Sequence, residues 1–324
     1  MGDTAIEFTV AIPTYNGASR LGMVLDKLHQ QVNTESFTWE ILIIDNNSTD
    51  NTSQLVQTYQ EGWEKKYKLR YCHETKQGAA FARKRAIEEA KAPIIGFLDD
   101  DNLPHNNWVA AAYTFAQKYP QAGAIASKIN PLWEVEPPPN FERIRSLLAI
   151  NDRGNEPLIY DPQSNLLPPS AGLVVRKEAW QNSVPEKCIL SGRVPGKMLT
   201  SEDLEVLSYI REAKWEIWYN PEMEIEHYIP HWRLQRDYLI PFVRGIGLSR
   251  YVTRMVGVKS WLKPVMFLAY FGNDLRKVIH HILRYGIAVK KDVVSACELE
   301  LFISSLISPF YLWKNGYLQS AEHE

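Results

Sequence analysis

Short apolar runs alternate with segments of helical periodicity along the first 130 residues of the chain. The run FTVAI at residues 8–12 is typical of a short buried strand. The segment after it puts five apolar residues on one helical stripe: Leu21, Val24, Leu25, Leu28 and Val32. The pattern recurs, with strands expected at residues 40–45, 69–72, 93–98 and 123–127 and helices at 53–59, 78–90 and 107–119. Such alternation predicts an α/β fold with a mostly parallel, Rossmann-like sheet flanked by helices.

Composition and charge narrow the classes of protein to which the chain can belong. It has 324 residues, 45% of them hydrophobic, and a formal net charge of −2, so a broadly basic nucleic-acid-binding surface is excluded. From Pro230 onward, 13 Lys and Arg stand against 7 Asp and Glu, a formal charge of +6, whereas the rest carries −8. We therefore expect one domain at residues 1–229 and a separate helical, amphipathic extension at 230–324.

The cysteines and the N-terminus bear on the compartment. Cys72, Cys188 and Cys297 are widely separated and form neither a disulfide framework nor a metal-ligand spacing, which favours a reducing cytoplasm. The N-terminal stretch lacks the basic and apolar regions of a secretory signal. These features predict a cytoplasmic protein.

The C-terminal extension alternates apolar stretches with Arg, Lys and aromatic residues. None of the stretches has the roughly 18–20 uninterrupted apolar residues of a membrane span. Two interpretations remain open: helices packed as a bundle over the first domain, or an apolar surface with basic flanks that lies on a membrane. The second would hold the protein peripherally at the inner face of the plasma membrane.

A polar loop follows each of the first four expected strands: PTYNG, DNNSTD, HETKQG and DDDN. Ligands of open α/β sheets bind beyond the carboxyl ends of the strands, so Asp45 and the acids at 99–101 are expected in one cleft. Asp99 and Asp101, two carboxylates separated by one residue, could ligate Mg²⁺ or Mn²⁺ and so relieve the repulsion among three adjacent acids. The alternative is a solvated acidic turn before the helix expected near Asn106.

Five blocks, in this order, resemble the inverting family-2 glycosyltransferases, which have the GT-A fold: VAIPTYNGASRL, ILIIDNNSTDNT, KQGAAFARKRAI, IIGFLDDDNLP and SEDLEV. The resemblance covers Phe8 to His227. It implies a metal-dependent enzyme, with Mn²⁺ or Mg²⁺, that moves a sugar from a nucleotide-sugar to a saccharide or lipid-linked acceptor, a UDP-sugar being the leading candidate donor. A narrower similarity, through FTVAIPTYNGASRL, FLDDDN and HWRLQRDY, is to glycosyltransferases of cyanobacterial hormogonium polysaccharide biosynthesis, and implies a role in exopolysaccharide synthesis.

The resemblance implies roles for residues on the nucleotide side. Pro13, Thr14 and Tyr15 would line the nucleotide pocket, and Asp45 would accept a hydrogen bond from the base. Gly78 would allow a close approach of the nucleotide.

Further residues would contact the ribose and the diphosphate. Arg83 would lie near the nucleotide, although Lys84 stands where the family has Asn. Asp99 or Asp100 would meet the ribose, with the choice between them open. Asp101 would bind the metal that bridges the diphosphate.

The resemblance also implies a catalytic base and an acceptor side. Asp203 in SEDLEV matches the base that takes the proton of the acceptor hydroxyl as it attacks the anomeric carbon, which inverts the configuration. The alternative for SED is a capped helix start. Ala171 and Gly172 match an acceptor-side segment, to which Glu202 is also assigned. His227 follows an expected strand and would supply a further metal ligand.

Two other classes of function stay open. A nucleotidyl- or phosphoryl-transferase would also place a metal on Asp residues, but PTYNGASR lacks the glycine-rich phosphate loop with lysine that it should carry. A non-catalytic nucleotide-sugar-binding protein would have no use for both the acidic cluster and SED. Because HWRLQR stands where processive relatives carry QxxRW, we expect a non-processive enzyme.

Overall fold

The structure is a computed structural model that describes residues 5–64, 67–162, 164, 166–192, 199–286, 289 and 291–318. Residues 1–4, on which part of the N-terminal prediction rests, lie outside the described residues. The chain forms two compact units, neither of them continuous in sequence. The first comprises Met1–Leu132, Ala149–Pro185 and Tyr209–Tyr228, and the second comprises Trp133–Leu148, Glu186–Ser208 and Ile229–Glu324.

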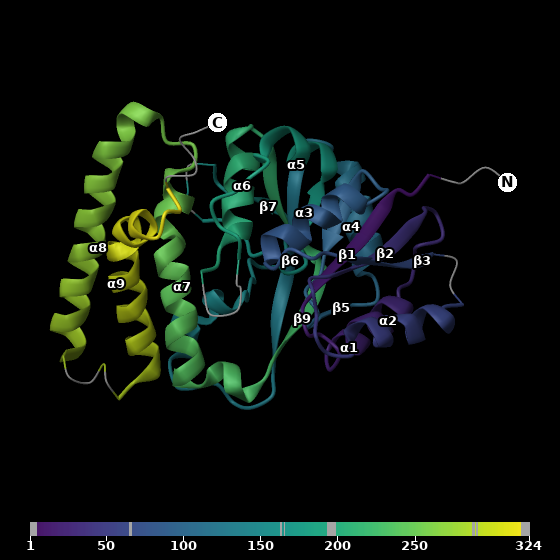
Figure 1. Ribbon diagram of the computed structural model, residues 1–324, viewed down its shortest axis with the longest axis horizontal. Coiled ribbons are helices and arrows are strands. Elements are labelled where there is room, and N and C mark those ends of the chain that lie inside the picture. The colour runs from purple at the N-terminus through teal and green to yellow at the C-terminus, as the bar shows by residue number, and fades with distance from the viewer. Residues whose placement is uncertain are drawn as a thin grey trace. The chain divides into compact units, whose positions relative to one another are not determined.

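Nine strands within the described residues form one sheet, in the order β3-β2-β1-β4-β8-β6-β9-β5, with β7 paired to β9 (Figure 1). The strands are β1 Phe8–Thr14, β2 Trp39–Asp45, β3 Lys68–His73, β4 Ile94–Phe97, β5 Asn102–Pro104, β6 Ala122–Trp133, β7 Leu158–Ile159, β8 Val174–Arg176 and β9 Glu216–Ile229. The sheet is mixed, as is usual for large sheets of α/β proteins.

The parallel part of the sheet is the part with strand–helix alternation. β1 pairs in parallel with β2 and β4, and β2 pairs in parallel with β3. In contrast, β8 is antiparallel to β4 and β6, and β5 is antiparallel to β9. The prediction of a mostly parallel sheet therefore holds for the first four strands only. β5 follows β4 within a few residues of sequence but lies at one end of the sheet, next to β9.

Helices cover both faces of the sheet in the first unit. They are α1 Leu21–His29, α2 Thr52–Glu61, α3 Ala79–Glu89, α4 Trp108–Lys118, α5 Lys177–Ser183 and α6 Glu202–Glu212, of which α6 begins in the second unit. Leu21 and Leu25 of α1 share one core with Phe8 of β1 and Trp108 of α4, whereas α3 lies against β1 and β2. The predicted stripe is correct up to Leu28. Val32 is exposed, because α1 ends at His29.

The second unit is mainly helical. Its long helices are α7 Arg236–Met255, α8 Lys263–Tyr285 and α9 Val293–Lys314, with short 3₁₀ helices at Phe141–Arg143, Arg145–Leu148, His231–Leu234 and Ser260–Leu262. Two arginines pair with acids of α9: Arg143 with Glu298, and Arg244 of α7 with Glu300. Glu298 and Glu300, which interrupt the apolar sequence of α9, thus connect this helix to other segments of the second unit.

Among the described helices, α9 is long and apolar enough to cross a membrane by length and composition. An 18-residue window of it has a mean hydropathy of 1.5, and 44% of that window is buried. Part of the buried surface is small and polar: Ser304, Ser305 and Ser308 are buried, and Ser308 Oγ donates to the Leu248 carbonyl of α7. This face of α9 is occupied by a neighbouring helix.

Candidate functional site

The carboxyl ends of β1, β2 and β4 meet at one edge of the sheet, as the alternation predicts. Thr14, the last residue of β1, stands beside Asp45, the last residue of β2, in the parallel register. Beyond β4, Leu98 leads directly into Asp99, Asp100 and Asp101. Each of the three acids lies against a different side chain that carries nitrogen: Asp100 against Arg20, Asp99 against Arg83 and Asp101 against His227.

Asp100 is held by Arg20 and Thr14. The Nε and Nη2 atoms of Arg20 donate to the two carboxylate oxygens at 3.0 and 2.9 Å, and Thr14 Oγ1 donates at 2.7 Å. Burial raises the pKa of Asp100 against the lowering effect of the Arg20 hydrogen bonds, and the neighbouring Asp101 adds to the rise. A Cβ on Gly17 would approach Thr14 Oγ1 to 2.1 Å, so only glycine leaves room for this cluster.

Arg20→Ala should lower the free energy of unfolding by about 2 kcal/mol, because it leaves the Asp100 carboxylate buried without its cation. This expected loss of unfolding free energy is smaller than for a fully buried ion pair, because the Arg20 side chain is 32% exposed. Urea denaturation measures it. Adding Asp100→Asn to Arg20→Ala should recover most of the loss, and Lys91→Ala, which removes an exposed cation of the same unit, should change little. Equal stability of Arg20→Ala and Lys91→Ala would show that the pair is not stabilising.

Asp99 faces Arg83 of α3. The Arg83 Nη2 atom donates to Asp99 Oδ1 at 3.1 Å and to Ser170 Oγ at 2.9 Å, and Arg83 is buried. The Asp99 side chain, in contrast, is 38% exposed. Of the two acids that compete for the ribose role, Asp99 is the accessible one and Asp100 is engaged inside the protein.

Asp101 and His227 lie side by side because β5 pairs with β9. Asn102, the first residue of β5, is opposite His227 in the antiparallel register, and the Asp101 Oδ1 atom is 3.6 Å from His227 Nε2. Both side chains are buried, and Asn102 Nδ2 donates to the same Asp101 oxygen at 3.1 Å. The expectation that His227 follows a strand is wrong: WEIWYN at residues 215–220 predicts a short strand, whereas β9 extends to Ile229 and includes His227.

The donor set of this pair fits a divalent ion in part. Within the described ranges, no group of three His, Cys, Asp or Glu side chains is arranged to hold a metal. Asp101 and His227 offer one carboxylate and one imidazole at nearly the separation of two ligands on one ion, about 3 Å. Mg²⁺ and Mn²⁺ often take one or two protein ligands and fill the other positions with substrate phosphates and water. The pair therefore fits a metal whose shell is completed by the substrate.

Asp45 and the loop beside it are tied into the protein by hydrogen bonds. Asp45 Oδ1 accepts from the Ser48 backbone N–H at 2.9 Å, and Oδ2 accepts from the Tyr71 hydroxyl at 2.6 Å. Burial and this hydrogen bond raise the pKa of Tyr71. Asn46 Oδ1 accepts from the Gly78 N–H at 2.7 Å, which places Gly78, directly before α3, next to the end of β2.

Pro13 and Tyr15 flank Thr14 at the end of β1. Pro13 is half-buried and stands opposite Ile44 of β2, whereas the Tyr15 side chain is exposed. Tyr15 is thus the most exposed of the three predicted pocket residues.

Ala171 and Gly172 form a tight turn that Leu173 connects to β8. Gly172 has a φ of +63°, and a Cβ there would come within 2.6 Å of Ser127 Oγ. Ser127 Oγ donates to the Gly172 carbonyl at 2.6 Å, and Ala171 is buried. Since Ser170, which binds Arg83, precedes this turn, the turn adjoins the Asp99 side of the site.

The SED segment opens α6 and belongs to the second unit. Glu202 is buried and Asp203 is half-buried. Glu205 is fully buried, and its two carboxylate oxygens accept from the backbone N–H groups of Ile189 and Leu190 at 2.9 and 2.8 Å. Burial raises the pKa of Glu205 to about 7. Glu205 thus anchors a neighbouring segment, which leaves Asp203 as the more accessible acid.

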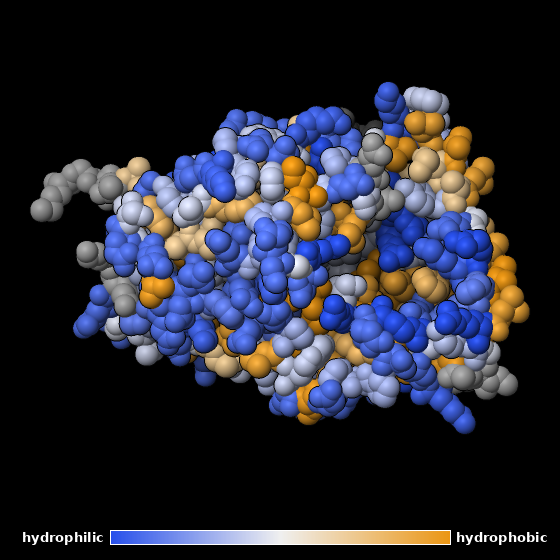
Figure 2. Space-filling view, turned by 180° about the vertical axis from the view of Figure 1, so that it is seen from behind, coloured by the Kyte–Doolittle hydropathy of each residue, from blue (hydrophilic) through white to orange (hydrophobic). Residues whose placement is uncertain are grey.

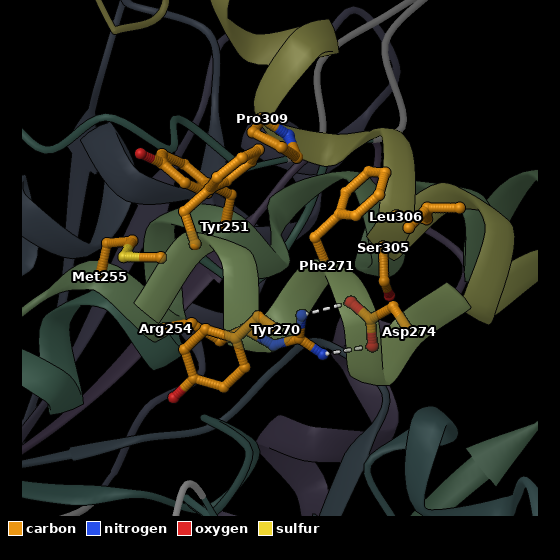
Figure 3. A pocket seen from close by; sticks show the side chains of 10 residues that line it. Tyr251, Arg254, Met255, Tyr270, Phe271, Asp274, Ser305, Leu306 and Pro309 are labelled. Carbon is orange, nitrogen blue, oxygen red and sulfur yellow. Dashed lines mark hydrogen bonds and ion pairs between the residues drawn. The ribbon is translucent and has the colours of Figure 1, made fainter. Parts of the chain in front are cut away.

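A small cavity lies in the second unit between α7, α8 and α9 (Figure 3). Its volume is about 20 Å³, and its lining includes Tyr251, Phe271, Pro309 and the ion pair of Arg254 with Asp274. Such a volume suits a water molecule and is far too small for a nucleotide. The cavity is therefore no alternative to the strand-end site.

Comparison with known proteins identifies the family. The family model described as "Glycosyl transferase family 2" matches residues 9–172, just over half of the chain. The chain belongs to glycosyltransferase family 2. The matched region includes β1 to β6, the three acids, Arg83 and the Ala171–Gly172 turn, whereas Asp203 and His227 lie beyond it.

Relatives in family 2 are similar over part of their length. Glycosyltransferase AglE of Haloferax volcanii is 31% identical over 101 residues, which cover 31% of this chain and 32% of AglE. The chain spans about a third or less of the length of the curated relatives that it matches first.

Solved structures share the GT-A fold. The mannosyltransferase PcManGT of Pyrobaculum calidifontis, in complex with GDP-Man and Mn²⁺, has a TM-score of 0.59 at 17% identity, over 94% of this chain and 87% of that one. TarS 1–349 of S. aureus, in complex with UDP-GlcNAc, has a TM-score of 0.51 at 14% identity, over 96% and 92% of the two chains. The fold expected from the sequence, a GT-A sheet with a C-terminal helical part, is confirmed.

Sequence reasoning missed several residues that shape the site. Arg20 stands in the block VAIPTYNGASRL without a role predicted for it, although it pairs with Asp100. Asn46 and Asn102 bind Gly78 and Asp101, and Ser170 binds Arg83. The sequence signal that could have found them is adjacency: Asn46, Asn102 and Ser170 are next to the predicted site residues Asp45, Asp101 and Ala171, and Arg20 precedes Leu21 of the helical stripe.

Proposed function

We propose that the protein is a metal-dependent, inverting, non-processive glycosyltransferase that moves one sugar from a nucleotide-sugar to a hydroxyl acceptor. The observation that carries this proposal is the pairing of Asp101 with His227 at the strand ends of a family-2 chain, beside an accessible Asp99. The complexes of TarS with UDP-GlcNAc and of PcManGT with GDP-Man and Mn²⁺, which share the fold, support a nucleotide-sugar and a divalent ion as ligands.

Residues at the strand ends would bind the nucleotide part of the donor. Tyr15 would contact the nucleotide through its exposed ring, with Pro13 and Thr14 contributing backbone. Asp45, already accepting two hydrogen bonds, would accept a further one from the base, commonly uracil. The exposed Asp99 would bind the ribose hydroxyls, and Gly78 would let the nucleotide approach the start of α3.

Asp101 and His227 would hold Mn²⁺ or Mg²⁺ together with the diphosphate. When bound, the ion stabilises the negative charge that develops on the departing diphosphate. Arg20 and Arg83 keep Asp100 and Asp99 in place and prevent their charges from adding to that of the diphosphate.

Asp203 would act as the general base. As the acceptor oxygen attacks the anomeric carbon, its proton passes to the Asp203 carboxylate, the new C–O bond forms, and the bond to the diphosphate oxygen breaks with its electron pair leaving on the nucleoside diphosphate. Attack from the face opposite the leaving group inverts the configuration. Ala171, Gly172 and Glu202 would border the acceptor.

The acceptor in our proposal is a saccharide or a lipid-linked molecule. The pathway would be exopolysaccharide synthesis, as the resemblance to hormogonium polysaccharide enzymes implies. The enzyme would work in the cytoplasm, held peripherally at the inner face of the plasma membrane.

A donor panel tests the proposal. With Mn²⁺ present, one UDP- or GDP-sugar at about a hundredfold excess over its Kd should raise the melting temperature by about 5 °C. The same sugar should be slowly hydrolysed, which mass spectrometry detects. EDTA should abolish both effects. A panel of UDP-, GDP-, dTDP- and CMP-sugars without any shift or hydrolysis would contradict the proposed function.

A further inference from the structure

One side of α8 carries an exposed apolar stripe. Its members follow the three- and four-residue spacing of a single helix face: Val265, Leu268, Leu275, Ile279, Ile282 and Leu283. Leu268 is 66% exposed and Leu283 is 81% exposed. In Figure 2 a band of hydrophobic surface follows the right-hand edge of the view, where α8 lies. We name these six residues the α8 stripe.

The opposite side of α8 is the side that packs within the unit. Asp274 is buried and accepts from both terminal nitrogens of Arg254 on α7, at 2.5 and 3.1 Å (Figure 3). His281 is buried as well, with its Nε2 atom 2.9 Å from the Ser295 carbonyl of α9. The α8 stripe is therefore not the core face of this helix.

The exposed apolar surface extends toward the end of α9. Phe310 of α9 contacts Phe267 and Phe271 of α8, with ring centroids 6.2 and 6.3 Å apart. The C-terminal end of α9 thus adjoins the N-terminal end of α8. Two exposed tryptophans lie near these ends: Trp261, in the 3₁₀ helix directly before α8, at 73% exposure, and Trp313, in the last turn of α9, at 65%. Tryptophan is the residue that favours the boundary between water and lipid.

The charge around the α8 stripe has one sign. Between Val256 and Lys291 the sequence has seven Lys and Arg and a single acid, Asp274, which Arg254 neutralises. Lys259, Lys263, Arg276 and Arg284 are exposed or half-buried on this segment. An apolar helix face with basic flanks is complementary to a surface that is both apolar and anionic.

We propose that the α8 stripe docks on an anionic lipid bilayer, with α8 lying in the plane of the interface. The six apolar side chains insert into the boundary between headgroups and acyl chains, while the flanking Lys and Arg side chains bind the lipid phosphates. A second copy of the chain is the less favoured occupant, because it would bring two positively charged segments together. The inference names a lipid bilayer as a partner of the proposed enzyme. It rests on the proposed function only in assigning the sugar transfer to the membrane surface.

Vesicle co-sedimentation of the full chain, without donor or metal, tests the inference. The protein should bind vesicles containing phosphatidylglycerol more tightly than vesicles of phosphatidylcholine alone, and the preference should shrink as salt rises. Leu268→Glu with Leu283→Glu should weaken binding at least about tenfold. Gly272→Leu should tighten it about threefold, since Gly272 interrupts the α8 stripe and a Cβ there meets no atom within 4 Å.

A matched control puts the same charges on exposed apolar residues of the other unit. Met23→Glu with Val32→Glu, at 42% and 45% exposure, should bind as the parent does. Equal binding of the parent and the Leu268→Glu, Leu283→Glu variant, or no binding by the parent, would overturn the inference. The inference would also be overturned if the parent sedimented as a dimer and did not bind vesicles, while the Leu268→Glu, Leu283→Glu variant sedimented as a monomer. Because no donor is present, these results are independent of the transferase test.

Discussion

Asp203→Asn should lower the rate of sugar transfer about a thousandfold, because an amide cannot take the proton of the acceptor hydroxyl. The substitution keeps the size of the side chain and an oxygen that can still accept from the Leu204 N–H, a bond of 2.8 Å in the parent. Nucleotide-sugar affinity should therefore stay within about twofold of the parent, since the base acts on the acceptor. Steady-state kinetics give the first quantity and calorimetry gives the second.

Glu212→Gln is the matched control, an exposed acid at the far end of the same helix. It should leave both rate and affinity unchanged. If Asp203→Asn transfers sugar as fast as this control, Asp203 is not the base. A loss of nucleotide affinity equal to the loss of rate would instead point to a structural role for the start of α6.

Asp101→Asn should remove the metal dependence of nucleotide binding. In Mn²⁺ the affinity for the nucleoside diphosphate should fall at least about tenfold, because a neutral amide replaces an anionic ligand. In EDTA the parent and the variant should bind alike. The amide retains an oxygen that can accept from Asn102 Nδ2, so the β5–β9 pairing should survive. Calorimetric titration with and without Mn²⁺ measures the difference.

Asp152→Asn, at an exposed acid in the first unit, controls for the general loss of a negative charge. It should retain the full response to Mn²⁺. His227→Ala should resemble Asp101→Asn if the imidazole is a ligand. A parent whose affinity is the same in Mn²⁺ and EDTA would show that the pair holds no metal during nucleotide binding.

The first four strands illustrate what patterning predicts well. Phe8, Ile43 and Ile94 lie in short apolar runs that are typical of central strands, and the helical stripe from Leu21 to Leu28 is typical of a core-facing helix. Asp45 and the acids after β4 fall at the strand ends because the parallel register aligns those ends. These features depend on neighbours along the chain, which the sequence displays directly.

The later elements show where patterning fails. β5 is a three-residue strand with no pattern of its own, and β9 extends well past the predicted strand to include His227. β5 and β9 pair with each other although they are distant in sequence, so the residues next to either strand do not predict the pairing. The two units likewise draw on separated segments, such as Trp133–Leu148 and Glu186–Ser208, which no boundary in composition marks.

The class of the fold, the family and the edge of the sheet where the site lies follow from the sequence alone, because periodicity, motifs and strand-end loops are local properties. The partner of each acid, in contrast, depends on how the chain folds in three dimensions: Arg20 lies against Asp100, Arg83 against Asp99 and His227 against Asp101. The partners of the first pair stand 80 residues apart. Such pairings follow from strand register and helix packing, and these are set when distant segments bury their apolar faces together.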